Sequence, residues 1–284
     1  SEGGVSAETL HKLEQHGFSW AASGESVYRH SQANDENSSL SGCSLYQGFT
    51  VDDSKLACFF RDDGLSDLIG FTYSDWHADD AVGNLIVHLE NIAASTRDQD
   101  RPLVSIILDG ENAWEHFPEN GFYFLDTLYR RLSEHPGLQM TTYSEYLSRP
   151  RSLPNIKKMV SGSWVYGTFS TWIGDKDKNR GWDMLGDAKK AFDETVREET
   201  LSGDQLLAVQ HQQSICEGSD WFWWFGDYNS ADTVSDFERL YRMHLSNLYT
   251  LMGTEPPEYL TEVFAHGGGN PEQTGVMRKG KFTG

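Results

Sequence analysis

The run Leu103-Val-Ser-Ile-Ile-Leu108 and the turn that follows it, Asp109-Gly-Glu-Asn112, decide the fold and carry the first sign of function. Five of the six residues in the run are apolar and three of those are β-branched, which predicts a buried β-strand. A carboxylate at the end of such a strand, followed by glycine and a second carboxylate, is poor core chemistry. Asp109 therefore either caps the next helix or handles protons at an active site, and the residues themselves favour neither role.

The composition excludes several classes of function. The 284 residues carry a net charge of −20, which repels nucleic acid and anionic membrane surfaces. No apolar run approaches the roughly 20 residues of a membrane helix, and we expect a cytoplasmic protein. Cys43, Cys58 and Cys216 form no C-x-x-C motif and are expected to be buried free thiols. The histidines have no metal-ligand spacing and no phosphate-binding glycine motif is present, so we expect neither a metal nor a cofactor.

Residues 1–154 alternate between strand and helix patterns, which predicts an α/β fold with parallel strands and helical crossovers. Strands are expected at residues 18–22, 55–60, 103–108 and 140–143. Helices are expected after the capping residue Ser6 and at residues 77–94 and 121–134.

Residues 155–260 are mostly helical in pattern, with helices expected at 182–198, 204–217 and 232–252. Two aromatic loops are expected among them, at 162–172 and 219–226. Trp164 and Trp172 lie in a stretch rich in glycine, serine and threonine, which favours sugar stacking over a place in the core. Residues 261–284 have no periodicity and are expected to be a linker or tail.

Several blocks of the sequence resemble glycoside hydrolase family 57, in the same order along nearly the whole chain. They are Ser1-Glu2-Gly-Gly-Val-Ser6, Gly17-Phe-Ser-Trp20-Ala-Ala-Ser-Gly-Glu25, Phe60-Arg-Asp62, Leu65-Ser-Asp67-Leu-Ile-Gly-Phe71, Leu108-Asp109-Gly-Glu-Asn-Ala-Trp114-Glu115, Gly162-Ser-Trp164, Thr171-Trp172-Ile-Gly174, Asn179 with Trp182, and Ser219-Asp220-Trp-Phe-Trp-Trp224. The resemblance implies part of an incomplete (β/α)7 barrel over residues 1–154, followed by an α-helical bundle over residues 155–260.

The resemblance also implies a chemistry, because that family acts on α-glucans with retention of configuration. Its members are α-amylases, amylopullulanases, branching enzymes and 4-α-glucanotransferases. The family pattern places the nucleophile at Glu2 and the acid/base at Asp109, two carboxyl groups that must lie about 5–5.5 Å apart. The substrate-binding candidates are Asp67, Glu111, Trp114, Trp164, Trp172, Asp220 and Trp223.

Two departures from the family pattern affect the expected partners. The family's N-terminal segments, including a His-Gln-Pro-like strand, would precede residue 1, and Ala22-Ser-Gly-Glu25 stands where the family has Ala-Thr-Asp-Glu. We therefore expect two partners: an α-glucan or maltooligosaccharide, and an N-terminal segment of the same protein that completes the barrel. The alternative is a non-catalytic α-glucan-binding protein derived from the same fold. A third possibility is a metal-dependent polysaccharide deacetylase on a related barrel, but this sequence does not contain the set of histidine ligands that such an enzyme needs.

Overall fold

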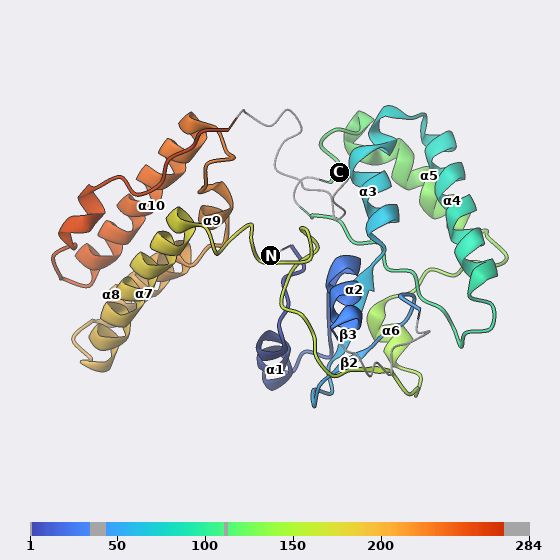
Figure 1. Ribbon diagram of the computed structural model, residues 1–284, viewed down its shortest axis with the longest axis horizontal. Helices are drawn as coiled ribbons and strands as arrows, with labels where there is room; N and C mark the ends of the chain where they lie inside the picture. Colours follow the sequence, from blue (N-terminus) through green and yellow to red (C-terminus); the bar gives the residue numbers. More distant parts are fainter. Residues whose placement is uncertain (1, 35–43, 111–112, 270–284) are drawn as a thin grey trace. The chain divides into compact units, whose positions relative to one another are not determined.

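The computed structural model describes residues 2–34, 44–110 and 113–269 (Figure 1). Its contacts divide the chain after Phe169 into two units, and each unit is considered by itself. Helices and short parallel strands occur together in the first unit and helices dominate the second, which confirms a mixed α/β fold. The predicted domain limits remain a prediction.

A parallel pair of strands, β1 (Trp20–Gly24) and β3 (Ala57–Arg61), lies at the centre of the first unit. All five residues of β3 are buried, as expected of a parallel strand that is covered on both faces. A second parallel pair joins β2 (Thr50–Val51) to β4 (Asn155–Ile156), and an antiparallel bridge from Phe49 to Cys58 connects β2 to β3. The strands predicted at 18–22 and 55–60 are thereby confirmed, each within two residues.

Helices follow the strands of the first unit and cover its core. They are α1 (Ala7–Gln15), α2 (Glu25–Ala33), α3 (Asp63–Phe71), η1 (Tyr73–Asp75), α4 (Ala78–Ser95), η2 (Pro118–Gly121), α5 (Phe122–Ser133) and α6 (Tyr143–Leu147). Ser6 caps α1 as predicted, because its hydroxyl accepts a hydrogen bond from the N–H of Thr9 at 3.1 Å. The apolar spacing that predicts a helix at 77–94 produces α4, which packs against α5 (Figure 1).

The strands predicted at 103–108 and 140–143 are not formed, and this expectation is wrong. Residues 102–109 and 138–142 carry no strand assignment, and Tyr143 already begins α6. The β-branched composition favours an extended backbone, but a strand also needs a hydrogen-bonded neighbour along its edge. The segment at 103–108 makes isolated hydrogen bonds to its surroundings instead of a ladder, such as the one that Asp62 N–H donates to the Ser105 carbonyl at 2.8 Å.

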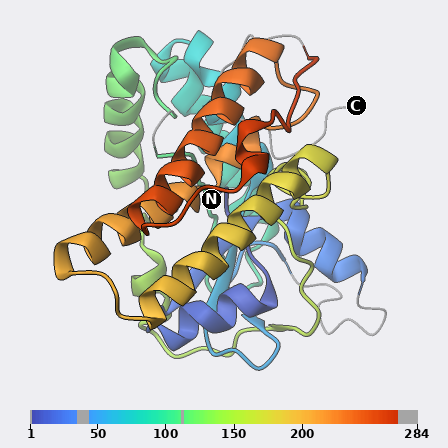
Figure 2. The same ribbon diagram turned by 90° about the vertical axis from the view of Figure 1, so that its left-hand side faces the viewer.

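The second unit is built from α7 (Lys176–Arg197), α8 (Gly203–Cys216), α9 (Asp220–Trp224), α10 (Ala231–Leu251) and η3 (Glu258–Thr261). In this unit α10 packs against α7, α8 and α9, and Figure 2 turns α10 and α7 toward the viewer. The three predicted long helices are confirmed as α7, α8 and α10. The prediction of an aromatic loop at 219–226 is wrong in part, because α9 forms there. Phe222 of α9 is buried and stacks on Trp182, with ring centroids 3.7 Å apart.

The start of the predicted tail packs against the second unit although it has no helix or strand. Ala265 is buried, and the ring of Phe264 meets that of Phe225 at a centroid distance of 5.1 Å. Gly268 N–H donates to the Asp227 carbonyl at 3.0 Å. Residues 270–284 lie outside the described residues. No described helix has both the length and the hydropathy that crossing a bilayer requires.

Cys58 and Cys216 are buried and not in a disulfide, as predicted, whereas Cys43 lies outside the described residues. Burial raises the pKa of each of these two thiols to about 12. At about pH 8 the thiolate fraction is then on the order of one in ten thousand, instead of about a quarter for an ordinary cysteine. Iodoacetamide should leave both residues unmodified in the folded protein and alkylate them in denaturant, as read by mass spectrometry of tryptic peptides. Rapid modification of either thiol under native conditions would contradict this expectation.

Candidate active site

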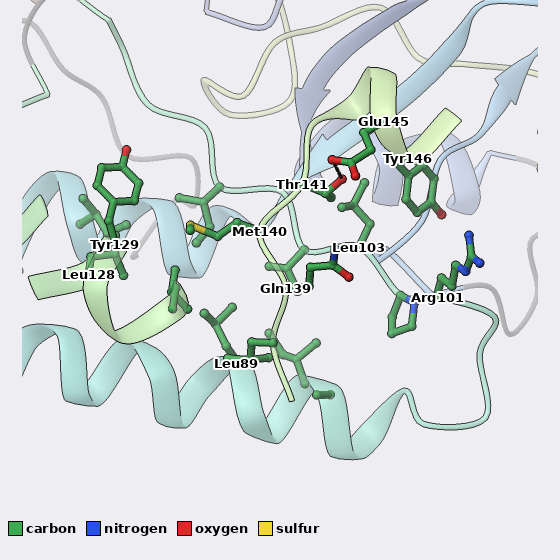
Figure 3. A pocket seen from close by; sticks show the side chains of 18 of the residues that line it. Leu89, Arg101, Leu103, Leu128, Tyr129, Gln139, Met140, Thr141, Glu145 and Tyr146 are labelled. Carbon is green, nitrogen blue, oxygen red and sulfur yellow. Dashed lines mark hydrogen bonds between the residues drawn. The ribbon is translucent and has the colours of Figure 1, made fainter. Parts of the chain in front are cut away.

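Asp109 lies at the end of the extended segment 103–108, half-buried at the edge of a cavity of about 850 Å³. Trp114 lines the same cavity, and Figure 3 shows Leu89 of α4 and Leu128 of α5 on its apolar wall. Glu111, the second carboxylate of the predicted turn, lies outside the described residues. Asp109, one catalytic candidate, is thus among the residues that line a mostly apolar cavity of the first unit.

Trp114 is held by the turn that precedes α5. Its ring meets those of Phe117 and Phe124 at centroid distances of 5.4 and 6.1 Å. Gly121 has a φ of +81°, and a Cβ there would lie 2.9 Å from the Trp114 ring, so only glycine fits. Glu119 and Asn120 also have left-handed backbones, at φ values of 49° and 51°. The Trp114 ring thus packs against Phe117, Phe124 and the backbone of Gly121.

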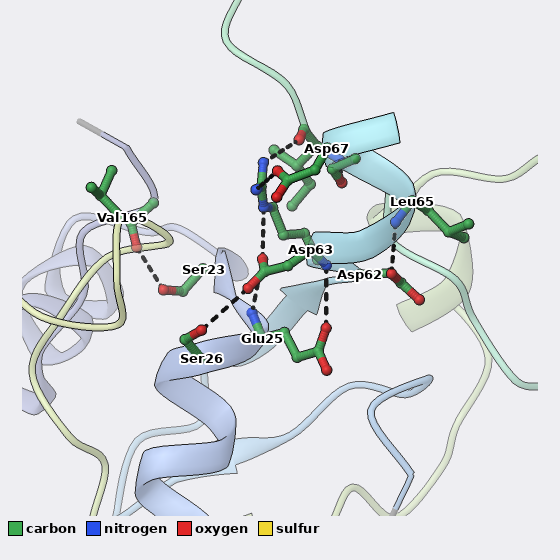
Figure 4. Close-up of polar contacts among 12 residues, drawn as sticks. Ser23, Glu25, Ser26, Asp62, Asp63, Leu65, Asp67 and Val165 are labelled. Atoms are coloured by element: carbon green, nitrogen blue, oxygen red, sulfur yellow. Dashed lines mark hydrogen bonds and ion pairs between the residues drawn. The ribbon is translucent and has the colours of Figure 1, made fainter. Parts of the chain in front are cut away.

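The parallel strands β1 and β3 end side by side, because Gly24 is paired with Arg61. Each strand leads directly into a helix whose first residue is acidic, Glu25 in α2 and Asp63 in α3. The Glu25 N–H donates to the Asp63 carboxylate at 3.3 Å, and the Asp63 N–H donates to the Glu25 carboxylate at 3.3 Å. Figure 4 shows this exchange, in which each acidic side chain caps the other helix.

Arg61 is the buried cation of this cluster, with 4% of its surface exposed. Its Nε donates to Asp63 and its Nη2 to Asp67, each at 2.8 Å, and its Nη1 donates to the Ile107 carbonyl at 3.0 Å. Burial raises the pKa of Asp63, and the nearby Glu25 carboxylate acts in the same direction while the Arg61 guanidinium opposes both. Asp67, a predicted substrate-binding residue, is thus an ion-pair partner of Arg61.

Arg61 also reaches the segment that carries Glu2. Its guanidinium lies over the ring of Trp164, 5.0 Å from the centroid, and the Trp164 N–H donates to the Glu2 carbonyl at 3.1 Å. Glu2 has a left-handed backbone with a φ of 48°, and the adjoining Val5 pairs with Gly162 through two backbone hydrogen bonds of 2.8 and 3.0 Å. One guanidinium therefore touches the tryptophan that fixes the Glu2 backbone and a carbonyl two residues before Asp109.

Three predicted substrate-binding residues belong to the second unit. The rings of Trp172 and Trp223 meet at a centroid distance of 5.8 Å, and both side chains are buried, with 7% and 6% of their surfaces exposed. Asp220 is exposed at the first position of α9. Trp164 of the first unit is also buried, with 8% exposed. The role of these tryptophans as sugar platforms stays a prediction.

Comparison with known proteins identifies the family. The family model of glycosyl hydrolase family 57 matches residues 1–157, more than half of the chain. The chain belongs to glycosyl hydrolase family 57. No curated protein sequence matches it significantly.

Two solved structures share the fold of this chain. The α-amylase AmyC from Thermotoga maritima superposes with a TM-score of 0.62 at 13% identity, covering 89% of this chain and 58% of AmyC. A family 57 branching enzyme from Thermococcus kodakaraensis superposes with a TM-score of 0.57 at 14% identity, covering 73% of this chain and 46% of the enzyme. The chain thus spans about half the length of these two structures.

Sequence reasoning did not select Arg61, Asp63 or Glu25 of this family 57 chain as site residues. A usable signal was present, because the buried run Ala57-Cys-Phe-Phe60 ends in Arg61-Asp62-Asp63. Charges placed directly after a fully buried strand need partners nearby, and the parallel neighbour β1 ends at the same level. In the described part of the chain, no group of three or more histidine, cysteine, aspartate or glutamate residues could hold a metal ion.

Proposed function

We propose that this family 57 chain carries the catalytic carboxylates of a retaining glycosidase or transglycosidase that acts on α-glucans. Glu2 is the nucleophile and Asp109 the acid/base. The observation that carries the proposal is the position of Arg61, which is bonded to the segment of Asp109 and lies over the tryptophan bonded to Glu2. A barrel of this kind collects catalytic residues from several strand ends at one mouth.

The proposed reaction has two displacements at the anomeric carbon. In the first, a Glu2 carboxylate oxygen bonds to that carbon, the glycosidic C–O bond breaks, and Asp109 gives its proton to the departing oxygen. In the second, Asp109 takes a proton from a water molecule or a sugar hydroxyl, whose oxygen bonds to the anomeric carbon and releases Glu2. Water gives hydrolysis and a sugar hydroxyl gives glucan transfer.

The proposed cycle requires Asp109 to start in its protonated form. Low polarity disfavours a charged carboxylate and favours the neutral acid. Glu2 must start ionised instead, because the carboxylate is the attacking form.

The proposed partners are a glucan and the rest of the barrel. Asp67, Glu111, Trp114, Trp164, Trp172, Asp220 and Trp223 are the residues proposed to contact the sugars. An N-terminal segment of the same protein is proposed to supply the remaining strands of the incomplete (β/α)7 barrel. The cytoplasmic location stays a prediction from the sequence.

A trapping experiment tests the nucleophile. An activated fluoro-glucosyl substrate that reacts quickly but deglycosylates slowly should leave an ester on Glu2, found by mass spectrometry of the peptide that contains Glu2. Glu2→Gln should abolish the label, whereas Glu8→Gln, an exposed change in the same segment, should leave it intact. A label on any other residue would exclude Glu2. Maltoheptaose binding with no label and no turnover, even with an N-terminal segment added, would favour a non-catalytic glucan-binding protein.

A further inference from the structure

Tyr146 of α6 is a buried tyrosine whose hydroxyl has no hydrogen-bond partner among the described residues. Its side chain lines the cavity of about 850 Å³, and 8% of its surface is exposed. The Phe59 ring of β3 meets the Tyr146 ring edge-on at a centroid distance of 5.7 Å, which fixes the orientation of the tyrosine. A buried hydroxyl of this kind needs an explanation, and a bound acceptor is one.

The guanidinium of Arg151 lies over the same ring. Its Cζ is 3.8 Å from the centroid of the Tyr146 ring, and its Nε is buried and also lacks a hydrogen-bond partner in the described part of the chain. An arginine that stacks on an aromatic ring keeps its in-plane N–H groups available as donors. The two unsatisfied donors belong to stacked groups, so one small oxyanion can accept hydrogen bonds from both.

Two further arginines line this cavity. Arg101 precedes the extended segment 103–108 and Arg149 follows α6, and both are exposed. Neither forms an ion pair or a side-chain hydrogen bond within residues 2–34, 44–110 and 113–269. Figure 3 shows the Arg101 side chain and the Tyr146 hydroxyl at the same end of the cavity. Arg101, Tyr146, Arg149 and Arg151 are called the donor end of the cavity.

The donor end carries more positive than negative charge. Glu145 is the carboxylate of α6 that lines the cavity, and one of its oxygens already accepts from the Thr141 hydroxyl at 3.0 Å. Asp109 lines the cavity beyond the far end of the extended segment. Three guanidinium groups and the Glu145 carboxylate leave an excess of two positive charges. In a chain of net charge −20, such a local excess attracts an anion.

The charge and the donors of this end select phosphate among small oxyanions. A neutral sugar cannot balance the excess charge, and a carboxylate offers one negative charge and two oxygens. A phosphate monoester carries a charge of about −1.5 to −2 at pH 7 and three acceptor oxygens, which match a phenol and several guanidinium groups. The adjoining part of the cavity is lined by the apolar side chains of Leu103, Leu132 and Leu138.

We propose that the donor end binds phosphate, either free or as the ester group of a small molecule whose body lies in the apolar part of the cavity. The Tyr146 hydroxyl and the Arg151 Nε donate to phosphate oxygens, and Arg101 and Arg149 supply the remaining positive charge. The site is distinct from the proposed catalytic pair, so it holds or fails without any role for Glu2 or Asp109.

Calorimetric titration of the whole chain with inorganic phosphate, at constant ionic strength, tests the tyrosine. Tyr146→Phe should weaken phosphate binding by at least about tenfold, because a hydrogen bond to a charged group is lost. Its urea midpoint without phosphate should stay the same or rise, since the hydroxyl has no partner in the protein. Tyr123→Phe, at an exposed tyrosine of α5, is the matched control and should alter neither quantity. Equal phosphate affinity in wild type and Tyr146→Phe would overturn the proposal.

Two arginine measurements test the rest of the site. Arg101→Gln should weaken phosphate binding about threefold, as expected of an exposed charge. Arg97→Gln removes an equal charge from an exposed residue that does not line the cavity, and it should leave the affinity unchanged. The Nε–H resonance of Arg151, assigned by its loss in Arg151→Lys, should shift at saturating phosphate. Equal losses in the two glutamine variants, or an unmoved Arg151 resonance, would show that phosphate binds elsewhere.

Phenyl phosphate and phenol distinguish the sources of the phosphate group. Affinity for phenyl phosphate at least about tenfold above that for inorganic phosphate would assign the site to a phosphate ester, because the ring then adds apolar burial. Equal affinities for the two phosphates would assign it to free phosphate. Phenol binding as tightly as phenyl phosphate, or no saturable binding of either phosphate, would overturn the proposal.

Discussion

Replacing Asp109 by asparagine should lower kcat/KM on maltoheptaose by about 10²- to 10⁴-fold, the usual contribution of a positioned general acid. The amide keeps the shape of the side chain but cannot protonate the departing oxygen. The loss should be smaller on an aryl glucoside, because a good leaving group departs without a proton. Steady-state kinetics on both substrates gives the ratio of wild-type to variant kcat/KM for each. The measurement uses the form of the protein that is active on maltoheptaose.

The matched control for this variant lies at the other end of the same segment. Asp100 is exposed and precedes the extended run, so Asp100→Asn removes an equal charge away from the cavity mouth. It should leave kcat and KM unchanged on either substrate. Wild-type turnover in Asp109→Asn, or equal losses on the two substrates, would remove Asp109 from the acid role.

Replacing Arg61 by alanine should lower the free energy of unfolding of the first unit by about 3–5 kcal/mol. The reason is that Asp63, fully buried, and Asp67 would keep their carboxylates without the guanidinium that compensates them. The Ile107 carbonyl would also lose its donor. Urea unfolding followed by hydrogen exchange at β3 amides measures the first unit separately from the second.

Two companion variants separate charge from geometry. Arg61→Lys should lower the free energy of unfolding, but by less than Arg61→Ala does. One ammonium group cannot reach Asp63, Asp67 and Ile107 at the angles that a guanidinium provides. Combining Arg61→Met with Asp63→Asn should restore part of the lost stability, since both buried charges are then removed. Equal unfolding free energies for wild type and Arg61→Ala would refute the role of the ion pair.

The ion pair between Arg61 and Asp63 makes the free energy of unfolding depend on pH. Because the pKa of Asp63 is raised in the folded state, its contribution to stability is fully present below the ordinary aspartate pKa and is lost as pH rises through the raised value. Without Arg61 the opposing attraction disappears, and the carboxyl group is more easily kept neutral. The cost of Arg61→Ala should therefore be smaller at about pH 4 than at about pH 7.

Local signals predicted the helices α1, α4, α5, α7, α8 and α10 but not the shorter α2, α3, α6 and α9. Ser6 caps α1, and the apolar residues of α4 recur at the spacing that buries one face. The extended segment at 103–108 was predicted correctly as apolar and extended but wrongly as a strand. Its neighbour is decided by tertiary contacts, and no pattern within six residues states which backbone lies beside it.

The candidate site was predictable only as a set of separate motifs. Family resemblance selected Glu2 and Asp109, and Asp67 was named for its place between a serine and an apolar run. The guanidinium that contacts these segments was not selected, because two of its four contacts, with Ile107 and Trp164, are made to residues far away in sequence. Arginine at the end of a buried strand is therefore the first residue to examine when carboxylates follow it.

The exchange of carboxylates between Glu25 and Asp63 has a consequence for how the first unit can be divided. Each strand-helix module lends its neighbour the group that completes a helix start. If one strand-helix module were moved into another protein, the first N–H of its helix would lose its carboxylate acceptor. Its own buried carboxylate would lose the N–H that donates to it. A piece of this chain that keeps both hydrogen bonds must therefore contain both strand-helix modules.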